Sequence, residues 1–506
     1  MGILIEDAHV LTMDGISGST PVVRSIRIEG DRIAEIGAGL TPADGDTVID
    51  GCDRLVVPGL VNAHTHSWET LFKGRYDNLP LELWLTMSYP ILGDSRVAPE
   101  LVRLRSTLFA IESLKAGVTT IVDDVIENPN QEWAQLAAVF DAYDEVGIRA
   151  NISGHVITRP FVDTIPFLDD LLDSAMVRHL RSLPALADDE YLDFCRRAFD
   201  TLHGRGDGRL RFMTAPSAPQ RCSPELIAGA TQLARTNDAE CHIHVLETKT
   251  QMITGPEHYG GTLVEYLHRI GALTANTTLA HGIWVTESDI ELVADARTSL
   301  AHNPVSNLKL GSGIAAWRLL HDAGVNVALG TDGCSSSDSP RMLDVVKTAA
   351  LLHKVTDPDF RRWPRVDEVL TAATIGGARS AVLDRVIGTI EVGKQADLVL
   401  FDLDTMAFTP RQKLDNQLVY SENGSSIDTV LVAGRVVVAG GEVTTVDERA
   451  TRAELDRLLP EIIAWQDDLD RRNAVLADAI SAAYFRAVAT PGPVNRFAGD
   501  ERAWLA

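Results

Sequence analysis

Hydrophobic residues in the middle of the chain gather in short runs, which alternate with stretches long enough to form helices. Residues 100–116 and 224–237 are examples of these helix-rich connections. Strands that alternate with helices predict a parallel sheet covered by the helices. Eight of them predict a closed (β/α)8 barrel of the TIM type. The eight apolar runs end near His66, Asp124, Gly154, Pro219, Glu247, Trp284, Pro304 and Gly333.

The two ends of the chain have a different texture, in which short alternating strands are separated by turn-forming residues. Because the same texture occurs at both ends, we expect the ends to meet in one small β-sandwich. The expected strands cover residues 3–9, 25–29, 33–36 and 47–49, and then 387–394, 396–401, 429–438 and 442–445.

The predicted fold is therefore α/β and has three parts. A β-sandwich combines residues 1–57 and 388–446, and the (β/α)8 barrel spans 58–387. Residues 447–506 form a helical extension, whose apolar positions recur at helical spacing but are interrupted by Pro460. We expect these helices to pack on the barrel or on another subunit of a homo-oligomer.

Composition narrows the range of functions. The chain has 506 residues, of which 45% are hydrophobic, so it can bury a large core. It carries 46 Lys and Arg against 71 Asp and Glu, and a formal charge of −25 disfavours nucleic acid and anionic membranes as partners. No apolar run approaches the roughly 18 residues of a membrane span, and no secretory signal pattern begins the chain. Five scattered cysteines fit a reducing compartment, so we expect a cytoplasmic protein.

Candidate chemistry is concentrated at the ends of the predicted barrel strands. His64 and His66 are two residues apart, so a strand directs both imidazoles to one face. Neutral imidazole is a good ligand for zinc and similar ions. Catalytic groups in such barrels lie at the C-terminal ends of the strands, where His244 and three further candidates also fall. These three are Glu247, His281 and Asp332. Alternation alone does not separate His242 from His244, because both face the same side.

Five segments of the chain resemble a known family. They read PGLVNAHTH, HIHVLETKTQ, LAHGIW, AHNPVSNLKLGSGIA and LGTDGCSSSDS. Together they are similar to the amidohydrolase superfamily, in the branch of cytosine, guanine and adenosylhomocysteine deaminases and triazine chlorohydrolases. The resemblance covers residues 1–446. It implies one divalent metal ion per chain, zinc or else iron(II), because residues 211–217 lack the bridging Lys or Glu of binuclear relatives. The implied ligands are His64, His66, His244 and Asp332.

The same resemblance implies the chemical roles. Glu247 and His281 are the implied acid and base, while His242 is placed inside the barrel. A bound divalent ion can lower the pKa of water toward neutrality. His281 and Asp332 can accept its proton, and Glu247 can protonate a ring nitrogen beside the attacked carbon. The expected reaction is deamination of a nitrogen heterocycle. Alternatives are hydrolytic dechlorination of a triazine, hydrolysis of a cyclic amide, and a scaffold protein that has lost its chemistry.

The expected substrate is a small heteroaromatic molecule. Related nucleoside deaminases usually carry an acidic ribose contact where Leu92 stands and a histidine where Ser217 stands, and these two departures argue against a nucleoside. Arg159 and Arg221 are further candidates near the mouth, although Arg159 also fits a solvated loop charge. Trp68 also fits a packing role, and His302 an architectural one. The candidate substrate contacts are Trp68, His155, Ser217, Gln220 and His302.

Overall fold

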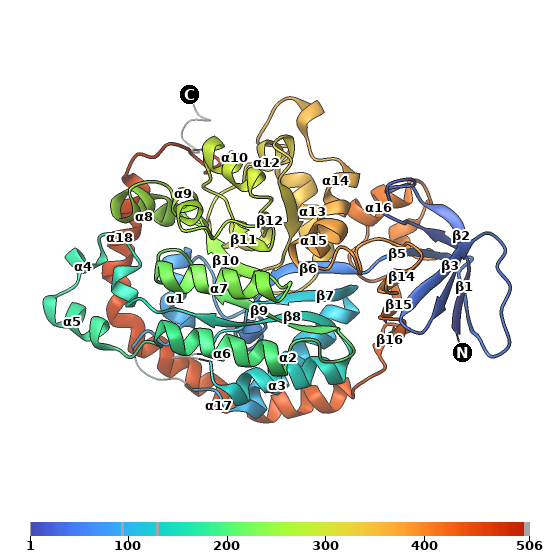
Figure 1. Ribbon diagram of the computed structural model, residues 1–506, viewed down its shortest axis with the longest axis horizontal. Coiled ribbons are helices and arrows are strands. Elements are labelled where there is room, and N and C mark those ends of the chain that lie inside the picture. The colour runs from blue at the N-terminus through green and yellow to red at the C-terminus, as the bar shows by residue number, and fades with distance from the viewer. Residues whose placement is uncertain (1, 93–95, 128–130, 500–506) are drawn as a thin grey trace.

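A parallel barrel forms the centre of the computed structural model, which describes residues 2–92, 96–127 and 131–499 (Figure 1). Its eight strands follow one another in chain order around the barrel, which confirms the predicted architecture. Their side chains are buried almost throughout, as expected for strands covered on both faces. The strands are β6 (Leu60–Thr65), β7 (Val118–Asp123), β8 (Arg149–Val156), β9 (Leu210–Pro216), β10 (Cys241–Val245), β11 (Thr277–His281), β12 (Ser299–His302) and β13 (Asn326–Leu329).

The barrel closes where the last strand meets the first. The backbone N–H of Asp332 donates to the carbonyl of His64 over 2.9 Å. The N–H of Thr331 donates to the side chain of Asn62, also over 2.9 Å. Closure brings Asp332 beside the histidines of β6, although 266 positions of chain, the difference between 332 and 66, separate it from His66.

Helices cover the outside of the barrel (Figure 1). Local sequence explains where several begin: α7 starts with Pro224 after Ser223, whose hydroxyl caps the N–H of Leu226. The helices up to the second sheet are α1 (Leu81–Ser88), α2 (Pro99–Lys115), α3 (Trp133–Val146), α4 (Leu168–Leu171), α5 (Ser174–Ser182), α6 (Asp188–Thr201), α7 (Pro224–Thr236), α8 (Lys249–Tyr259), α9 (Leu263–Arg269), α10 (Glu287–Asp295), α11 (Pro304–Lys309), α12 (Trp317–Asp322), α13 (Met342–Leu352), α14 (Val366–Thr371) and α15 (Gly377–Ser380).

A second sheet combines both ends of the chain, as expected, and lies at one end of the molecule (Figure 1). Its nine strands form one continuous hydrogen-bonded sheet, in which β5 and β14 pair antiparallel and so join the two ends. Arg149 of the barrel makes a buried ion pair of 2.7 Å with Asp397, which precedes β14. The strands are β1 (Gly2–Val10), β2 (Val22–Glu29), β3 (Arg32–Gly37), β4 (Thr47–Asp50), β5 (Arg54–Pro58), β14 (Leu398–Asp402), β15 (Ile427–Val432), β16 (Arg435–Ala439) and β17 (Glu442–Val443). Helix α16 (Leu414–Tyr420) lies between β14 and β15.

Two of the expected late strands differ from the structure. Residues 387–394 form turns rather than a strand, and both glycines there, Gly388 and Gly393, have positive φ angles of 94° and 92°. Residues 429–438 are not one strand, because Ala433 and Gly434 also adopt positive φ and turn the chain between β15 and β16. Turn geometry, rather than hydrophobic pattern, decides both cases.

The C-terminal extension consists of α17 (Glu448–Asn473) and α18 (Ala477–Ala489). The expected interruption at Pro460 is wrong, since α17 is one helix of 26 residues that continues through the proline. A proline removes one backbone hydrogen bond, and the buried face of α17 compensates, for example through Gln466, which donates to the carbonyl of Leu71 over 2.7 Å. Helix α17 packs on α1 and α2, and α18 packs on α1, α4 and α8.

The segment after α18 returns to the barrel. The carbonyl of Arg496 accepts a hydrogen bond of 2.8 Å from the N–H of Ile314, and the Phe497 ring packs on Trp284. Residues 500–506 of the predicted extension lie outside the described residues. Within the described ranges, no helix is both long enough and apolar enough to cross a membrane.

Candidate active site

Four imidazoles and two carboxylates meet at the barrel mouth, the end where the C-terminal ends of the strands lie. Oδ1 of Asp332 is 3.4 Å from Nε2 of His64 and 3.3 Å from Nε2 of His66. Nε2 of His244 is 3.3 Å from Nε2 of His66. Overlapping trios of ligand atoms, which also include His281, lie within 4.8 Å of one another. This donor set suits a divalent ion such as zinc.

Backbone carbonyls orient two of the histidines. Nδ1 of His66 lies 2.7 Å from the carbonyl of Asp124, and Nδ1 of His244 lies 2.9 Å from the carbonyl of Ser217. A carbonyl only accepts, so each Nδ1 carries the proton and each Nε2 presents a lone pair to the centre. Metal-binding histidines are commonly held in this way.

His64 is oriented through a chain of side chains. Its Nδ1 is 2.8 Å from Nε2 of His242, whose Nδ1 is 2.9 Å from a carboxylate oxygen of Glu240. The carboxylate fixes the proton of His242 on Nδ1, so His242 accepts from His64 and leaves Nε2 of His64 bare. Within the described part of the chain, that buried nitrogen has no hydrogen-bond partner, which is the state expected of a metal ligand. Burial lowers the pKa of His64 to about 3, so the ring is neutral. The structure thus places His242 behind His64, inside the barrel.

Asp332 is held from two sides. Its Oδ2 accepts a 2.6 Å hydrogen bond from the hydroxyl of Ser306, and its Oδ1 accepts from the N–H of Gly333 over 2.8 Å. Burial acts to raise the pKa of Asp332, but the close contact with His64 and the neighbouring imidazoles of His281 and His66 outweigh it and lower the pKa. Asp332 and His281 both have positive φ, 64° and 73°, a conformation that L residues adopt mainly where function or packing requires it.

Glu247 and His281 lie side by side next to the cluster. Nε2 of His281 is 3.7 Å from Oε2 of Glu247 and 4.0 Å from Oδ2 of Asp332. Nδ1 of His281 is 3.0 Å from the side-chain oxygen of Asn307, which fixes the ring. Burial raises the pKa of Glu247 well above its usual value, and the charge of Asp332 adds to this. A carboxyl that holds its proton is suited to protonate a substrate, whereas burial lowers the pKa of His281 and suits it to accept a proton.

A small cavity of about 20 Å³ opens on these groups. Arg221 reaches it, and Leu81, Trp84 and Leu85 from α1 form much of its apolar wall. The remaining lining residues are His66, Glu69, Tyr89, His244, Glu247, His281, Leu310, Asp332 and Ser336. The wall therefore combines aromatic rings with three acids (Glu69, Glu247 and Asp332) and one cation beside the histidines.

The structure places Trp68 behind this wall rather than in it. The Trp68 ring packs edge-on against Phe72, with centroids 5.8 Å apart, and against Tyr89, at 5.2 Å. His155 also lies behind the cavity, where its Nδ1 contacts Oδ2 of Asp124 at 2.8 Å. Asp124 in turn supplies the carbonyl that orients His66. In this structure Trp68 and His155 therefore support residues of the mouth.

Ser217 and Gln220 are buried beside the mouth but do not line the cavity. Ser217 uses its carbonyl to orient His244, and its hydroxyl lies 3.3 Å from the guanidinium of Arg221. Arg159 is turned away, with its guanidinium 2.9 Å from the hydroxyl of Tyr259.

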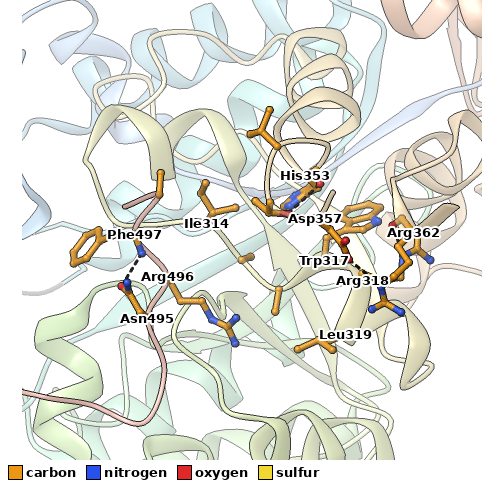
Figure 2. A pocket seen from close by; sticks show the side chains of 15 residues that line it. Ile314, Trp317, Arg318, Leu319, His353, Asp357, Arg362, Asn495, Arg496 and Phe497 are labelled. Atoms are coloured by element: carbon orange, nitrogen blue, oxygen red, sulfur yellow. Dashed lines mark hydrogen bonds and ion pairs between the residues drawn. The ribbon is translucent and has the colours of Figure 1, made fainter. Parts of the chain in front are cut away.

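His302 contacts a set of residues outside the metal cluster. Its Nε2 is 3.1 Å from Nε2 of His353, and His353 lines a separate cavity of about 440 Å³. Figure 2 shows that cavity between His353, Trp317 and the returning C-terminal segment with Arg496. The structure therefore brings His302 together with a different set of residues.

Sequence reasoning missed Glu69, Trp84 and Tyr89 as lining residues. Burial raises the pKa of Glu69 to about 7, which marks it as an unusual carboxylate. The available signal was an acid three residues after His66, in a segment otherwise made of buried residues. Tyr89 ends an apolar helix, and only the packing of that helix over the mouth reveals its position.

Comparison with known sequences agrees with the predicted family. Residues 55–437 match the model of the amidohydrolase family. A 5-methylthioadenosine/S-adenosylhomocysteine deaminase of Caldanaerobacter subterraneus subsp. tengcongensis is 34% identical over 92% of this chain and 99% of its own. A 5'-deoxyadenosine deaminase of Methanothermobacter thermautotrophicus is 35% identical over 88% of this chain and 95% of its own.

Solved structures give the same result. Atrazine chlorohydrolase from Arthrobacter aurescens, complexed with zinc, matches with a TM-score of 0.82 and 26% identity over 90% of this chain and all of its own. An adenosine deaminase from Xanthomonas campestris with bound zinc matches with a TM-score of 0.78 and 29% identity over 92% of this chain and 98% of its own.

These matches extend over both the barrel and the second sheet, and the two relatives named above from the sequence comparison are deaminases. The chain is therefore a metal-dependent hydrolase that acts on a C–N bond of an amidine in a nitrogen heterocycle. The cluster at the mouth, together with the zinc-bound relatives, supports a divalent metal ion. The chain belongs to the amidohydrolase family.

Proposed function

We propose that this chain removes the exocyclic amino group of a purine-type ring, with one zinc ion held by His64, His66, His244 and Asp332. The observation that carries the proposal is that the Nε2 atoms of His64 and His66 converge on the Asp332 carboxylate, with Nε2 of His244 3.3 Å from that of His66, beside an acid whose pKa is raised. The names of the relatives, which are deaminases of adenosine derivatives, support a purine.

The residues fit a single ion. The bare, buried Nε2 of His64 is the clearest sign, because burial of an unpartnered nitrogen is costly unless something binds it. Three neutral imidazoles and one carboxylate leave a coordination position for water. A divalent ion bound there supplies a nucleophilic hydroxide at neutral pH.

The side chains then move the protons. Glu247 donates its proton to the ring nitrogen next to the attacked carbon, which makes that carbon electrophilic. His281 and Asp332, which lie within 4.0 Å of each other, accept the proton lost during attack. Return of a proton to the amino group makes it a leaving group, and ammonia departs as the ring becomes a lactam.

The cavity limits the substrate. At about 20 Å³ it has room for about one water molecule. A heteroaromatic ring needs more space, so binding requires a shift of the wall formed by α1 and Leu310. Trp84 and Tyr89 of that wall then offer flat surfaces for stacking on the ring.

Hydrolytic dechlorination is the second candidate. It uses the same metal and the same acid, and the match to atrazine chlorohydrolase, with a TM-score of 0.82, favours it. Chloride is then the leaving group in place of ammonia. Hydrolysis of a cyclic amide is a third reaction open to the same metal ligands and acid, and it releases neither ammonia nor chloride.

The test is a panel of aminopurines, aminopterins, aminopyrimidines and aminotriazines, with free bases and 5'-deoxynucleosides of the purines. The protein carries a measured amount of zinc, and ammonia and chloride are both quantified. Ammonia from a purine at about one zinc per chain supports the proposal. Chloride release from a chlorotriazine without ammonia release from any purine overturns it. Zinc as the metal, a cytoplasmic location and a homo-oligomeric state stay predictions, and the second and third rest on composition and resemblance.

A further inference from the structure

Glu69 is a buried carboxylate in the mouth that the proposed chemistry does not use. It lies on the 3₁₀ helix Ser67–Phe72, directly after the histidines of β6, and its side chain lines the cavity. Its Oε2 accepts two hydrogen bonds from Ser335, one from the N–H over 2.9 Å and one from the hydroxyl over 2.6 Å. Its Oε1 is buried and has no hydrogen-bond partner among the residues that the structure describes.

The close packing around Glu69 fixes its carboxylate in place. A Cβ atom on Gly333 would overlap the Glu69 carboxylate, so the close approach depends on that glycine. Ser335 holds one oxygen from the loop after β13. The loop after β13 therefore fixes the position of Oε1, which has little freedom to reach another partner in the protein.

Glu69 and Glu247 come from opposite sides of the barrel. Glu69 follows β6, the first barrel strand, and Glu247 follows β10, the fifth of eight. Both line the same cavity, so a flat ring bound there lies between the two carboxyl groups. Glu247 and His281, two of the three groups that move protons in the proposed reaction, lie together, with Nε2 of His281 3.7 Å from Oε2 of Glu247. Glu69 is outside the trios of ligand atoms that suit the metal.

We propose that Oε1 of Glu69 accepts a hydrogen bond from a second N–H or amino group of the substrate ring, distinct from the amino group that leaves. A buried acceptor without a partner is destabilising, and a site built around one rejects ligands that lack the matching donor. The preferred substrate is thus a heterocycle with two donor groups. This inference rests on the proposed deaminase function and adds the substrate class.

The test compares two substrates that differ by one amino group, taken from the ring class that the wild type deaminates. For purines the pair is 2,6-diaminopurine and adenine as their 5'-deoxynucleosides, because both free bases carry a further ring N–H donor. We expect the wild type to have the higher kcat/KM on the diamino compound. The informative variant is Glu69→Gln. Because Ser335 supplies two donors to the Oε2 position, the amide oxygen must take that position and the amide NH₂ then faces the cavity. A donor replaces the acceptor without a change of size.

In Glu69→Gln we expect the preference for the diamino substrate to fall by about 10- to 100-fold. The matched control is Glu82→Gln. Glu82 is also buried, with Oε1 held by the hydroxyl of Thr248 over 2.7 Å and Oε2 unpartnered, but it does not line the cavity. Its variant should keep the wild-type ratio of kcat/KM values. Ser335→Ala, which releases the carboxylate, should weaken the preference less than Glu69→Gln does.

Each outcome decides the matter. An unchanged ratio of kcat/KM values in Glu69→Gln overturns the inference. If both kcat/KM values fall equally, Glu69 contacts the leaving amino group; if neither falls, Glu69 does not contact the substrate. A fall in zinc content in Glu69→Gln makes Glu69 a metal ligand and also overturns it. Melting temperature, measured for each variant, separates these results from misfolding, and a poorly folded Glu69→Gln leaves Ser335→Ala to decide. If the wild type releases no ammonia from any ring, the proposed function itself fails, and that result is distinct.

Discussion

Two clusters of histidines lie in this barrel, and they differ in what surrounds them. The mouth cluster (His64, His66, His244, His281 and Asp332) includes a carboxylate that contacts two of its imidazoles, and its outer nitrogens are held by carbonyls or by other side chains. In the rear cluster (His302, His321, His353 and Trp317), no imidazole forms an ion pair with a carboxylate of the described residues. Its two central imidazoles face each other at 3.1 Å, and Trp317 packs on His353.

The difference shows what makes a group of histidines a reactive site. In the mouth cluster the outer partners fix each proton on the far nitrogen, so the lone pairs converge. In the rear cluster the Nε2 atoms of His302 and His353 can share only one proton, and burial lowers the pKa of both rings. The two clusters contain a similar number of histidines. The mouth cluster differs in that the lone pairs of its imidazoles point inward and that a carboxylate contacts them.

The largest expected effect separates the clusters directly. Asp332→Asn removes the negative ligand of the mouth cluster, so we expect zinc content to fall well below one per chain and kcat/KM to fall by at least about 10³-fold. His353→Gln should keep both near the wild-type values. Metal analysis measures the zinc content, and the rate of ammonia release measures kcat/KM. Loss of zinc from His353→Gln would show that the two clusters are not functionally separate.

Glu247→Gln tests the acid of the mouth. The amide keeps the size of the side chain but cannot donate a proton as a carboxylic acid does. We expect kcat to fall by about 10²- to 10⁴-fold while zinc content and melting temperature stay close to wild type. A variant with near-normal kcat would contradict the assigned role.

His242→Asn tests the orientation of His64 from behind. The loss of the link from Glu240 through His242 frees the His64 ring, so we expect zinc affinity to fall by about 10- to 100-fold. Competition with a chelator measures this affinity. Asn307→Ala is the parallel change behind His281; it should lower kcat and leave zinc affinity unchanged, because His281 is not among the proposed ligands.

The sequence predicted the elements whose pattern is local. The eight barrel strands are short apolar runs, and residues at their ends must share one mouth, so His64 and Asp332 could be expected to meet. Sequence could not separate His242 from His244, since both face the barrel interior, and their hydrogen bonds decide the matter. It also failed at 387–394 and at Pro460, where turns and tertiary packing outweigh the hydrophobic pattern.

The substrate wall was harder to predict because it comes from connections rather than strands. Trp68 and Trp84 are both buried aromatic residues near the first strand, and only the path of α1 brings Trp84 to the cavity. His302 ends a barrel strand as His281 does, yet it pairs with His353 on α13's C-terminal side. Position at a strand end brings a residue near the mouth, but the loops decide what it contacts.

The smallest expected effect concerns the pH dependence of stability in the rear cluster. Burial lowers the pKa of His353 to about 4, from a usual value near 6.5. Between these values the unfolded chain binds a proton that the folded protein excludes, so stability falls as pH decreases from about 6.5 to 4. One such group contributes at most about 1.4 kcal/mol per pH unit. We expect His353→Gln to be less stable than wild type at pH 7, because it loses packing against Trp317, but to lose less stability on acidification. Urea unfolding of both proteins at pH 7 and pH 5, with zinc held constant, measures the difference, and parallel losses in the two proteins would show that His353 does not titrate on unfolding.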